Sequence, residues 1–300
     1  MNALHPRIGL ALGSGSARGW SHIGVIRVLE RAGISPDIVC GTSIGALVGA
    51  AYAAGELDRL EPWVRGLTWP AVLGLLDLKM GGGLIEGGEL VEFFRRHYSG
   101  PEIQHLPKTY GCVATALRSG RELWLREGPV IDAVRASIAL PGLFTPAVRE
   151  GQLLVDGGLV NPVPVSLCRA LGADIVIAVD LNWDLIGRRT RAQVLDGDAP
   201  AAPEPADNGL LDAILARFRS DEVPASPADH PSMLDVLTTS LNIMQVRITH
   251  SRLAGEPADA MIRPRLSHIA AMDFHRAESA IAEGERAAEA VLPLIRDLLN

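Results

Sequence analysis

The sequence predicts a three-layer α/β/α domain in which helices cover both faces of a mostly parallel central sheet. Two observations support this prediction. The first half of the chain alternates short apolar runs, such as residues 7–12 and 37–40, with stretches that favour helices. In addition, the chain has 300 residues, of which 48% are hydrophobic, and this is enough to bury a large core.

The first predicted strand, residues 7–12, ends in a glycine-rich turn that a helix follows. A strand, such a turn and a helix N-terminus form a cradle for an anion. A dinucleotide loop is one interpretation, but the spacing is G-x-G-x-x-x-G and no acidic residue ends the second strand. The other interpretation is an oxyanion hole, in which backbone N–H groups of Gly15, Ser16 and Ala17 face a carbonyl oxygen as it gains charge.

A nucleophile elbow is predicted at Gly41-Thr42-Ser43-Ile44-Gly45. Residues 37–40 form a β-branched run before this G-x-S-x-G motif, and small helix-forming residues follow it, as in the strand, sharp turn and helix of an elbow. Ser43 would be the nucleophile. Gly41 and Gly45 would leave space where side chains meet the neighbouring strand and helix. Alone, the pentapeptide also fits a glycine-rich turn with a surface serine.

The strand predicted at residues 152–155 delivers Asp156 into the glycine turn Gly157-Gly158. Such a sequence is also common in plain turns with a solvated carboxylate. Its position in the chain, after a cradle and an elbow, favours a general base instead. That role requires the carboxylate to lie about 2.6–3.2 Å from the Ser43 hydroxyl. Burial would raise the pKa of Asp156 from about 3.9 and make it a better base.

These motifs, in this order, resemble the patatin-like phospholipases, most of all bacterial members related to the neuropathy target esterase catalytic domain. The resemblance covers about residues 7–182. It implies a patatin-like fold, a Ser43–Asp156 dyad without histidine, and hydrolysis of acyl esters in phospholipids or lysophospholipids. The segments that carry the resemblance are residues 12–19, 22–25, 41–45, 137–144, 156–158 and 174–180.

The glycine-rich turn departs from the family pattern, because Ser14 and Ser16 interrupt a run that is usually all glycine. The turn keeps Gly13, and Arg18 matches the arginine of the family motif. The resemblance places both residues in the oxyanion loop. We expect Arg18 to fix the loop by bonding backbone carbonyls or a carboxylate, or to meet an anionic head group.

We expect residues 8–168 to form the catalytic region and residues 169–300 to complete the same domain. Proline and acidic residues dominate residues 199–205 and 223–231, which predicts a mobile insertion at about residues 196–231. The remaining apolar patterns predict helices at residues 57–67, 89–98, 129–139, 233–253 and 277–299, and strands at residues 110–117, 122–126 and 261–264.

The composition limits which binding partners and which cellular compartment we expect. A formal charge of −7 argues against nucleic acid. Three cysteines lie far apart in apolar runs, which indicates reduced thiols in a cytoplasmic protein. No apolar run approaches the roughly 20 residues of a membrane span, and no signal peptide is recognisable, so we expect at most peripheral membrane contact. No cluster has metal-ligand spacing, and we expect neither metal nor cofactor.

Two alternatives remain at this point. A classical α/β-hydrolase triad has the order Ser, Asp, His, and His230, His250, His268 and His275 all follow Asp156. However, an elbow after only 42 residues is early for that fold. The second alternative is a lipid-binding or regulatory module that keeps the fold without turnover.

Overall fold

The computed structural model describes residues 5–68, 70–71, 102–141, 143–185 and 233–300. The helix expected at residues 89–98 and the insertion expected at residues 196–231 lie outside the described residues.

The described residues form an eight-stranded sheet with the order β5-β6-β3-β2-β1-β7-β8, and β4 pairs with β3. All pairings from β3 through β2, β1 and β7 to β8 are parallel, whereas β4 and β6 run antiparallel to β3. The predicted mostly parallel sheet is therefore confirmed. The strands are β1 (Ile8–Leu12), β2 (Ile38–Thr42), β3 (Thr109–Ala116), β4 (Glu122–Leu125), β5 (Ala147–Arg149), β6 (Gln152–Asp156), β7 (Ile175–Val179) and β8 (Ala260–Ile262).

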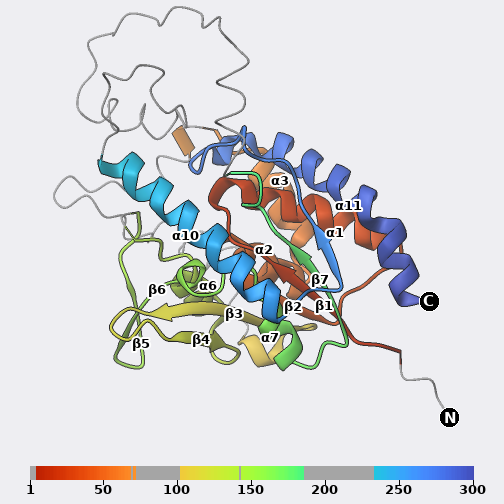
Figure 1. Ribbon diagram of the computed structural model, residues 1–300, viewed down its shortest axis with the longest axis horizontal. Coiled ribbons are helices and arrows are strands. Elements are labelled where there is room, and N and C mark those ends of the chain that lie inside the picture. Colours follow the sequence, from red (N-terminus) through yellow and green to blue (C-terminus); the bar gives the residue numbers. More distant parts are fainter. Residues whose placement is uncertain (1–4, 69, 72–101, 142, 186–232) are drawn as a thin grey trace, which may run out of the picture.

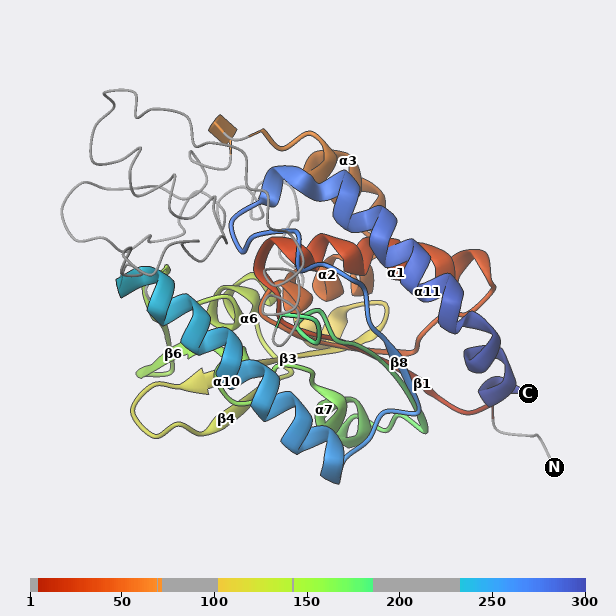
Figure 2. The same ribbon diagram turned by 45° about the horizontal axis from the view of Figure 1, so that its top comes forward.

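Helices cover both faces of the sheet, as the three-layer prediction requires (Figures 1 and 2). Along β1, Leu10 and Leu12 pack under one helix layer while Ala11 packs under the other. Burial on both faces explains why the strands are apolar runs rather than alternating ones. One layer holds α1 (Ser21–Arg31), α2 (Ile44–Ala53), α3 (Leu57–Arg65), α6 (Val130–Ser137) and α11 (Ala277–Leu299). The opposite side holds α7 (Val165–Ala170) and α10 (Met233–Gly255).

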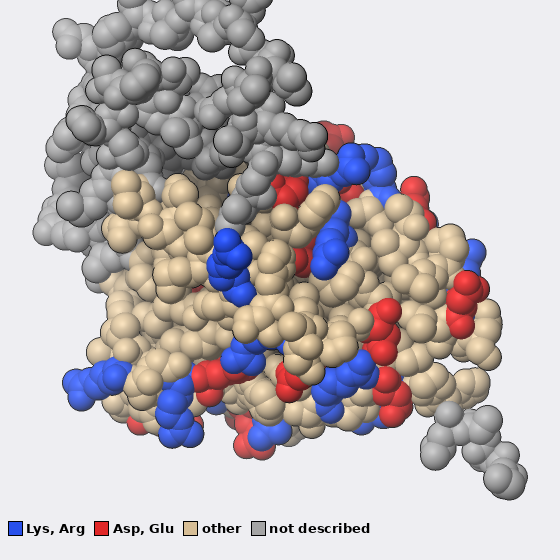
Figure 3. Space-filling view, in the orientation of Figure 1, with Lys and Arg blue, Asp and Glu red and all other residues tan. Residues whose placement is uncertain are grey.

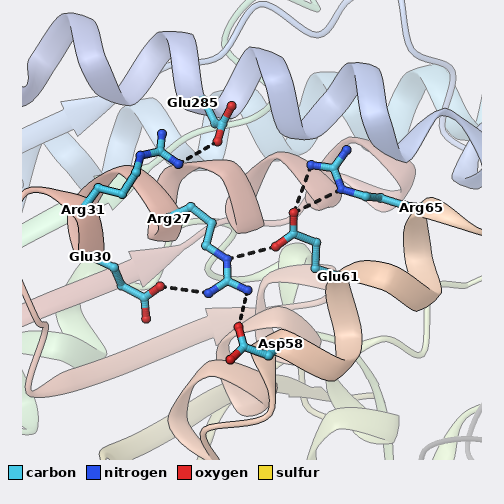
Figure 4. Close-up of polar contacts among 7 residues, drawn as sticks. All are labelled: Arg27, Glu30, Arg31, Asp58, Glu61, Arg65 and Glu285. Carbon is cyan, nitrogen blue, oxygen red and sulfur yellow. Dashed lines mark hydrogen bonds and ion pairs between the residues drawn. The ribbon is translucent and has the colours of Figure 1, made fainter.

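Ion pairs join α1 to its two neighbours (Figure 4). Arg27 Nε donates to Glu61 at 2.9 Å and its Nη2 donates to Asp58 at 2.6 Å, both on α3. Arg31 Nη1 donates to Glu285 of α11 at 3.0 Å. Because these groups are partly exposed, each pair stabilises the fold by only about 1 kcal/mol or less. The contact between α1 and α11 must therefore depend mainly on packing.

Glycines allow that packing. A Cβ atom on Gly24 of α1 would lie 2.0 Å from the Ile281 carbonyl oxygen, and one on Gly284 of α11 would lie 2.0 Å from the Ser21 carbonyl oxygen. Both obstacles are backbone atoms, so neither can move without shifting a helix. The two helices touch at a distance that only glycine permits.

We therefore expect Gly24→Ala to lower the free energy of unfolding by about 3 kcal/mol, because the methyl group must push α11 away from α1. Urea unfolding monitored by circular dichroism would measure this loss. Gly255→Ala is the control, because nothing lies within 4 Å of the Cβ position there, and it should change stability by less than about 1 kcal/mol. Equal effects of the two substitutions would contradict this account of the packing.

Candidate active site

Sheet register brings Ser43 and Asp156 together on the same edge of β3, where the end of β2 meets the end of β6, while β4 occupies the other edge. Thr42 is paired with Val113 on β3, and Asp156 is paired with the next residue, Ala114. Because β6 runs antiparallel to β3, its last residue arrives where β2 ends. Ser43 Oγ donates a hydrogen bond to Asp156 Oδ2 at 2.6 Å.

The turn at Ser43 is sharp, as a nucleophile elbow requires. Ser43 has φ 57° and ψ −125°, a positive φ that non-glycine residues rarely adopt. A Cβ atom on Gly41 would lie 2.3 Å from the Gly45 carbonyl oxygen, and one on Gly45 would lie 2.2 Å from the Leu12 carbonyl oxygen. These contacts are the physical reason for a glycine on each side of the serine.

Ser137, at the end of α6, fixes the backbone of the elbow through the Ser43 amide. The Ser43 amide donates to Ser137 Oγ at 2.9 Å, and Ser137 Oγ donates to the Val113 carbonyl at 2.7 Å. Ser137 is fully buried. The resemblance includes this residue within residues 137–144, but the sequence carries no signal for its role. Ser137 ties the strained turn to β3, the strand along which Ser43 and Asp156 meet.

Asp156 is fully buried, and its carboxylate accepts two hydrogen bonds from the described residues. One comes from Ser43, and the other comes from the Gly158 amide to Oδ1 at 2.7 Å. Burial raises the pKa of Asp156 from 3.8 to about 6, while the hydrogen bonds from Ser43 and Gly158 act in the opposite direction. A Cβ atom on Gly157 would lie 2.2 Å from the Val113 carbonyl oxygen, so the turn requires glycine there.

Residues 13–19, the predicted oxyanion loop, lie beside Ser43 and have two amides that no acceptor among the described residues engages. The Ala17 amide, one of the three expected donors, is engaged instead with the Ala271 carbonyl at 3.0 Å. The amides of Gly13 and Ser14 also donate to backbone carbonyls. Among the described residues, no acceptor receives the N–H of Gly15 or Ser16. Ser16 has φ 50°, a positive value that a glycine would adopt with less strain.

Two buried side chains brace this loop. Arg18 Nε donates to the Gly15 carbonyl at 3.2 Å, which is one of the two roles expected for this arginine. His22 Nε2 lies 2.8 Å from the Gly13 carbonyl oxygen. Burial lowers the pKa of His22 to about 4, so the imidazole is neutral near pH 7 and its Nε2–H donates to Gly13. Within the described residues, no hydrogen bond joins a histidine to Ser43 or Asp156.

A pocket opens over Ser43 and Asp156, and its wall is mostly apolar. Helix α10 forms one side of it, through side chains that sequence reasoning did not connect with the site. The lining residues are Ser14, Gly15, Ser16, Arg18, Ser43, Leu140, Pro141, Leu143, Asp156, Leu237, Leu241, Asn242, Gln245, Ala271 and Met272.

In the described part of the chain, no three or more His, Cys, Asp or Glu residues are grouped as ligands of a metal ion would be. No helix among the same residues is long and apolar enough to cross a bilayer.

Comparisons with known proteins support the resemblance seen in the motifs. The family model described as patatin-like phospholipase matches residues 10–169. An uncharacterised NTE family protein of Mycobacterium tuberculosis is 34% identical, with 96% of this chain and 91% of that protein covered. Lysophospholipase NTE1 of Pyricularia oryzae is 29% identical over 97% of this chain, which spans 19% of that protein. The crystal structure of VipD from Legionella pneumophila is 14% identical with a TM-score of 0.45, covering 98% of this chain and 76% of that one.

The raised pKa of Asp156 predicts a pH-dependent stability. Because the folded state holds this proton up to about pH 6 and the unfolded state only to about 3.8, stability falls as pH rises from about 4 to 6. Above pH 6 the charged carboxylate destabilises the fold by about 3 kcal/mol. Asp156→Asn removes this charge, so the variant should be more stable than the parent at pH 8 by up to that amount and similar to it at pH 4.

Chemical denaturation at both pH values would measure this difference. The exposed Asp132→Asn is the matched control and should show no gain that grows with pH. A variant at Asp156 that is less stable at pH 8 than at pH 4, relative to the parent, would contradict the buried-charge account.

Proposed function

Because the chain belongs to the patatin-like phospholipase family, we propose that it is a serine esterase that hydrolyses acyl esters of phospholipids or lysophospholipids. The observation that best supports this proposal is the 2.6 Å hydrogen bond from Ser43 Oγ to a buried Asp156, at a strained elbow that faces an apolar pocket. Such a pocket suits an acyl chain, and the pair of residues suits attack on its ester carbonyl.

In the proposed first step, Asp156 Oδ2 accepts the Ser43 proton as Oγ attacks the ester carbonyl carbon. The carbonyl oxygen becomes negative and would be stabilised by the amides of Gly15 and Ser16, together with the N-terminus of α2. Asp156 then gives the proton to the leaving alcohol, which departs and leaves an acyl-enzyme. Water attacks this ester in the reverse sequence and releases the fatty acid, so no cofactor takes part.

The raised pKa of Asp156 supports its role as the base. A carboxylate with an ordinary pKa is a weak base toward a serine hydroxyl, because the two pKa values lie far apart. Burial raises the pKa of Asp156 to about 6 and so reduces this difference. The lipid-binding alternative would favour an occluded serine. Ser43 is partly exposed and lines the pocket, which favours the enzyme.

We further propose that the protein works in the cytoplasm at a membrane surface, where its substrates reside. Three free, buried cysteines suit a reducing compartment. Figure 3 shows few charged side chains over α10, and charged groups gather along the lower edge of that view. Apolar side chains of α10 that are 43–49% exposed are Val236, Leu237, Ile243 and Met244. Leu237 also lines the pocket, so this surface leads to Ser43.

Labelling with a fluorophosphonate probe tests the proposal directly, because the probe reacts only with an activated serine. We expect the modification to map to Ser43 and to be absent from Ser43→Ala. That variant should lower kcat for a lysophospholipid by roughly 1,000-fold or more, and Asp156→Asn should cost nearly as much, because the two residues act as one unit.

Two controls accompany this test. The exposed Ser119→Ala should label and turn over like the parent. Single alanine substitutions at His230, His250, His268 and His275 should each cost less than about tenfold. A histidine whose loss matched that of Ser43 would overturn the dyad, and an unlabelled, inactive parent protein would favour the lipid-binding alternative.

The pKa of the base also sets the pH dependence of turnover. Asp156 is protonated below pH about 6 and then cannot accept the Ser43 proton. We therefore expect kcat/KM to rise about tenfold per pH unit at low pH, to bend near pH 6 and to level off above it. Initial rates on a soluble acyl ester between pH 4.5 and 8 would measure this profile. A flat profile would exclude Asp156 as the base.

A further inference from the structure

We infer that Gln245 of α10 is a positioning residue that fixes the oxyanion loop relative to the Asp156 turn. This inference rests on the proposed hydrolase activity and deepens it, because it adds a residue that lies beyond residues 10–169, the region that the family model matches.

On the side that faces the loop, hydrogen bonds join Gln245 to two other buried polar side chains, Ser14 and Asn182. Ser14 Oγ donates to Gln245 Oε1 at 3.0 Å, and Asn182 Nδ2 donates to the same oxygen at 3.1 Å. Asn182 Nδ2 also lies 3.2 Å from the Ser14 carbonyl oxygen. Exposures of 2%, 2% and 7% for Ser14, Asn182 and Gln245 mean that water cannot easily replace these bonds.

On its other side, Gln245 fills the space beside the acid turn. A Cβ atom on Gly158 would lie 2.7 Å from Gln245 Nε2. Gly158 is the residue whose amide donates to Asp156 Oδ1. One side-chain amide therefore touches the loop that would bind the oxyanion and the turn that holds the base.

Helix α10 is itself tied to the elbow, so Gln245 has a firm support. Two turns further along the helix, Arg252 forms an ion pair with Glu122 of β4. Glu122 Oε1 also accepts from Asn161 Nδ2 at 2.7 Å, and the Asn161 carbonyl accepts from Thr42 Oγ1 at 2.8 Å. Thr42 precedes the nucleophile. The helix is thus fixed to the strand that carries Ser43.

This arrangement gives a physical reason for the serine at position 14. A glycine there would lack the hydroxyl that bonds Gln245, so the loop could then be held from this side only by its backbone. The amides of Gly15 and Ser16 directly follow Ser14, and their direction depends on its position. Because an oxyanion forms only in the transition state, a displaced loop should lower kcat more than it raises KM.

The first experiment compares Gln245→Ala, the equally long but non-bonding Gln245→Met, and Ser14→Gly, with the exposed Thr239→Ala of α10 as the control. We expect kcat to fall about 10- to 100-fold in the first three, with KM within about threefold, and to stay unchanged in Thr239→Ala. Because Ser14 and Gln245 act through one bond, their double variant should lose no more than the worse single variant.

Full activity in Gln245→Met would show that only packing matters and would overturn the inference. Multiplied losses in the double variant, or an effect confined to KM, would also overturn it.

A second measurement does not need turnover. Hydrogen–deuterium exchange in residues 13–19 should be at least about tenfold faster in Gln245→Met than in the parent, while exchange in α1 stays the same. Unchanged exchange in the loop would overturn the positioning role, whatever the activity. An inactive parent in which exchange still responds to Gln245 would instead refute the proposed hydrolase and leave the positioning role in place.

Discussion

Burial of the Asp156 carboxylate is the constraint on which the rest of the site depends. Among the described residues, Ser43 Oγ and the Gly158 amide each donate one hydrogen bond to this carboxylate, and these two bonds replace its contacts with water. A buried charge with so few partners is costly and so prefers to be neutral, which is why its pKa rises. The same cost makes it a better proton acceptor. Stability and reactivity are thus set by one environment.

The neighbouring residues fix the groups that surround this carboxylate. Gly157 lets the turn pass close to β3, and Ser137 fixes the strained amide of Ser43 to that strand. The predicted oxyanion loop is fixed at the Gly13 carbonyl by His22, which burial keeps neutral. A protonated histidine at that place would add a positive charge with no carboxylate bonded to it. Around Ser43, the pocket brings together hydroxyls, the Asp156 carboxylate, the Arg18 guanidinium and the side-chain amide of Gln245.

The sequence allowed the fold class and the main motifs to be predicted because these depend on local patterns. The strand, turn and helix around Ser43 and the glycine turn after Asp156 are short-range signals, and β2, α2 and β6 form where they indicated. The antiparallel pairing of β6 with β3, which brings Asp156 to Ser43, has no such signal. Neither has the bond between Ser14 and Gln245, which are 231 positions apart.

The engagement of the Ala17 amide was missed for the same reason, since its acceptor, Ala271, is equally remote in the chain. The local sequence pattern predicts where the loop lies, but it does not predict which of the loop's amides remain without an acceptor. The wall of the pocket was missed as well, because α10 reads from sequence as an ordinary helix and only tertiary packing turns it toward Ser43.

The remote partners of the first fifty residues have a consequence for biosynthesis. The loop, the elbow and α1 are synthesised before the residues that they contact. The partners of Ala17, Ser14 and Gly24 are Ala271, Gln245 and Ile281, which follow more than 200 residues later in the chain. Closing such long loops is slow, and until it happens apolar faces of the nascent chain stay uncovered. The loop beside Ser43 therefore gains its last contacts only after α10 and α11 have been synthesised and have docked.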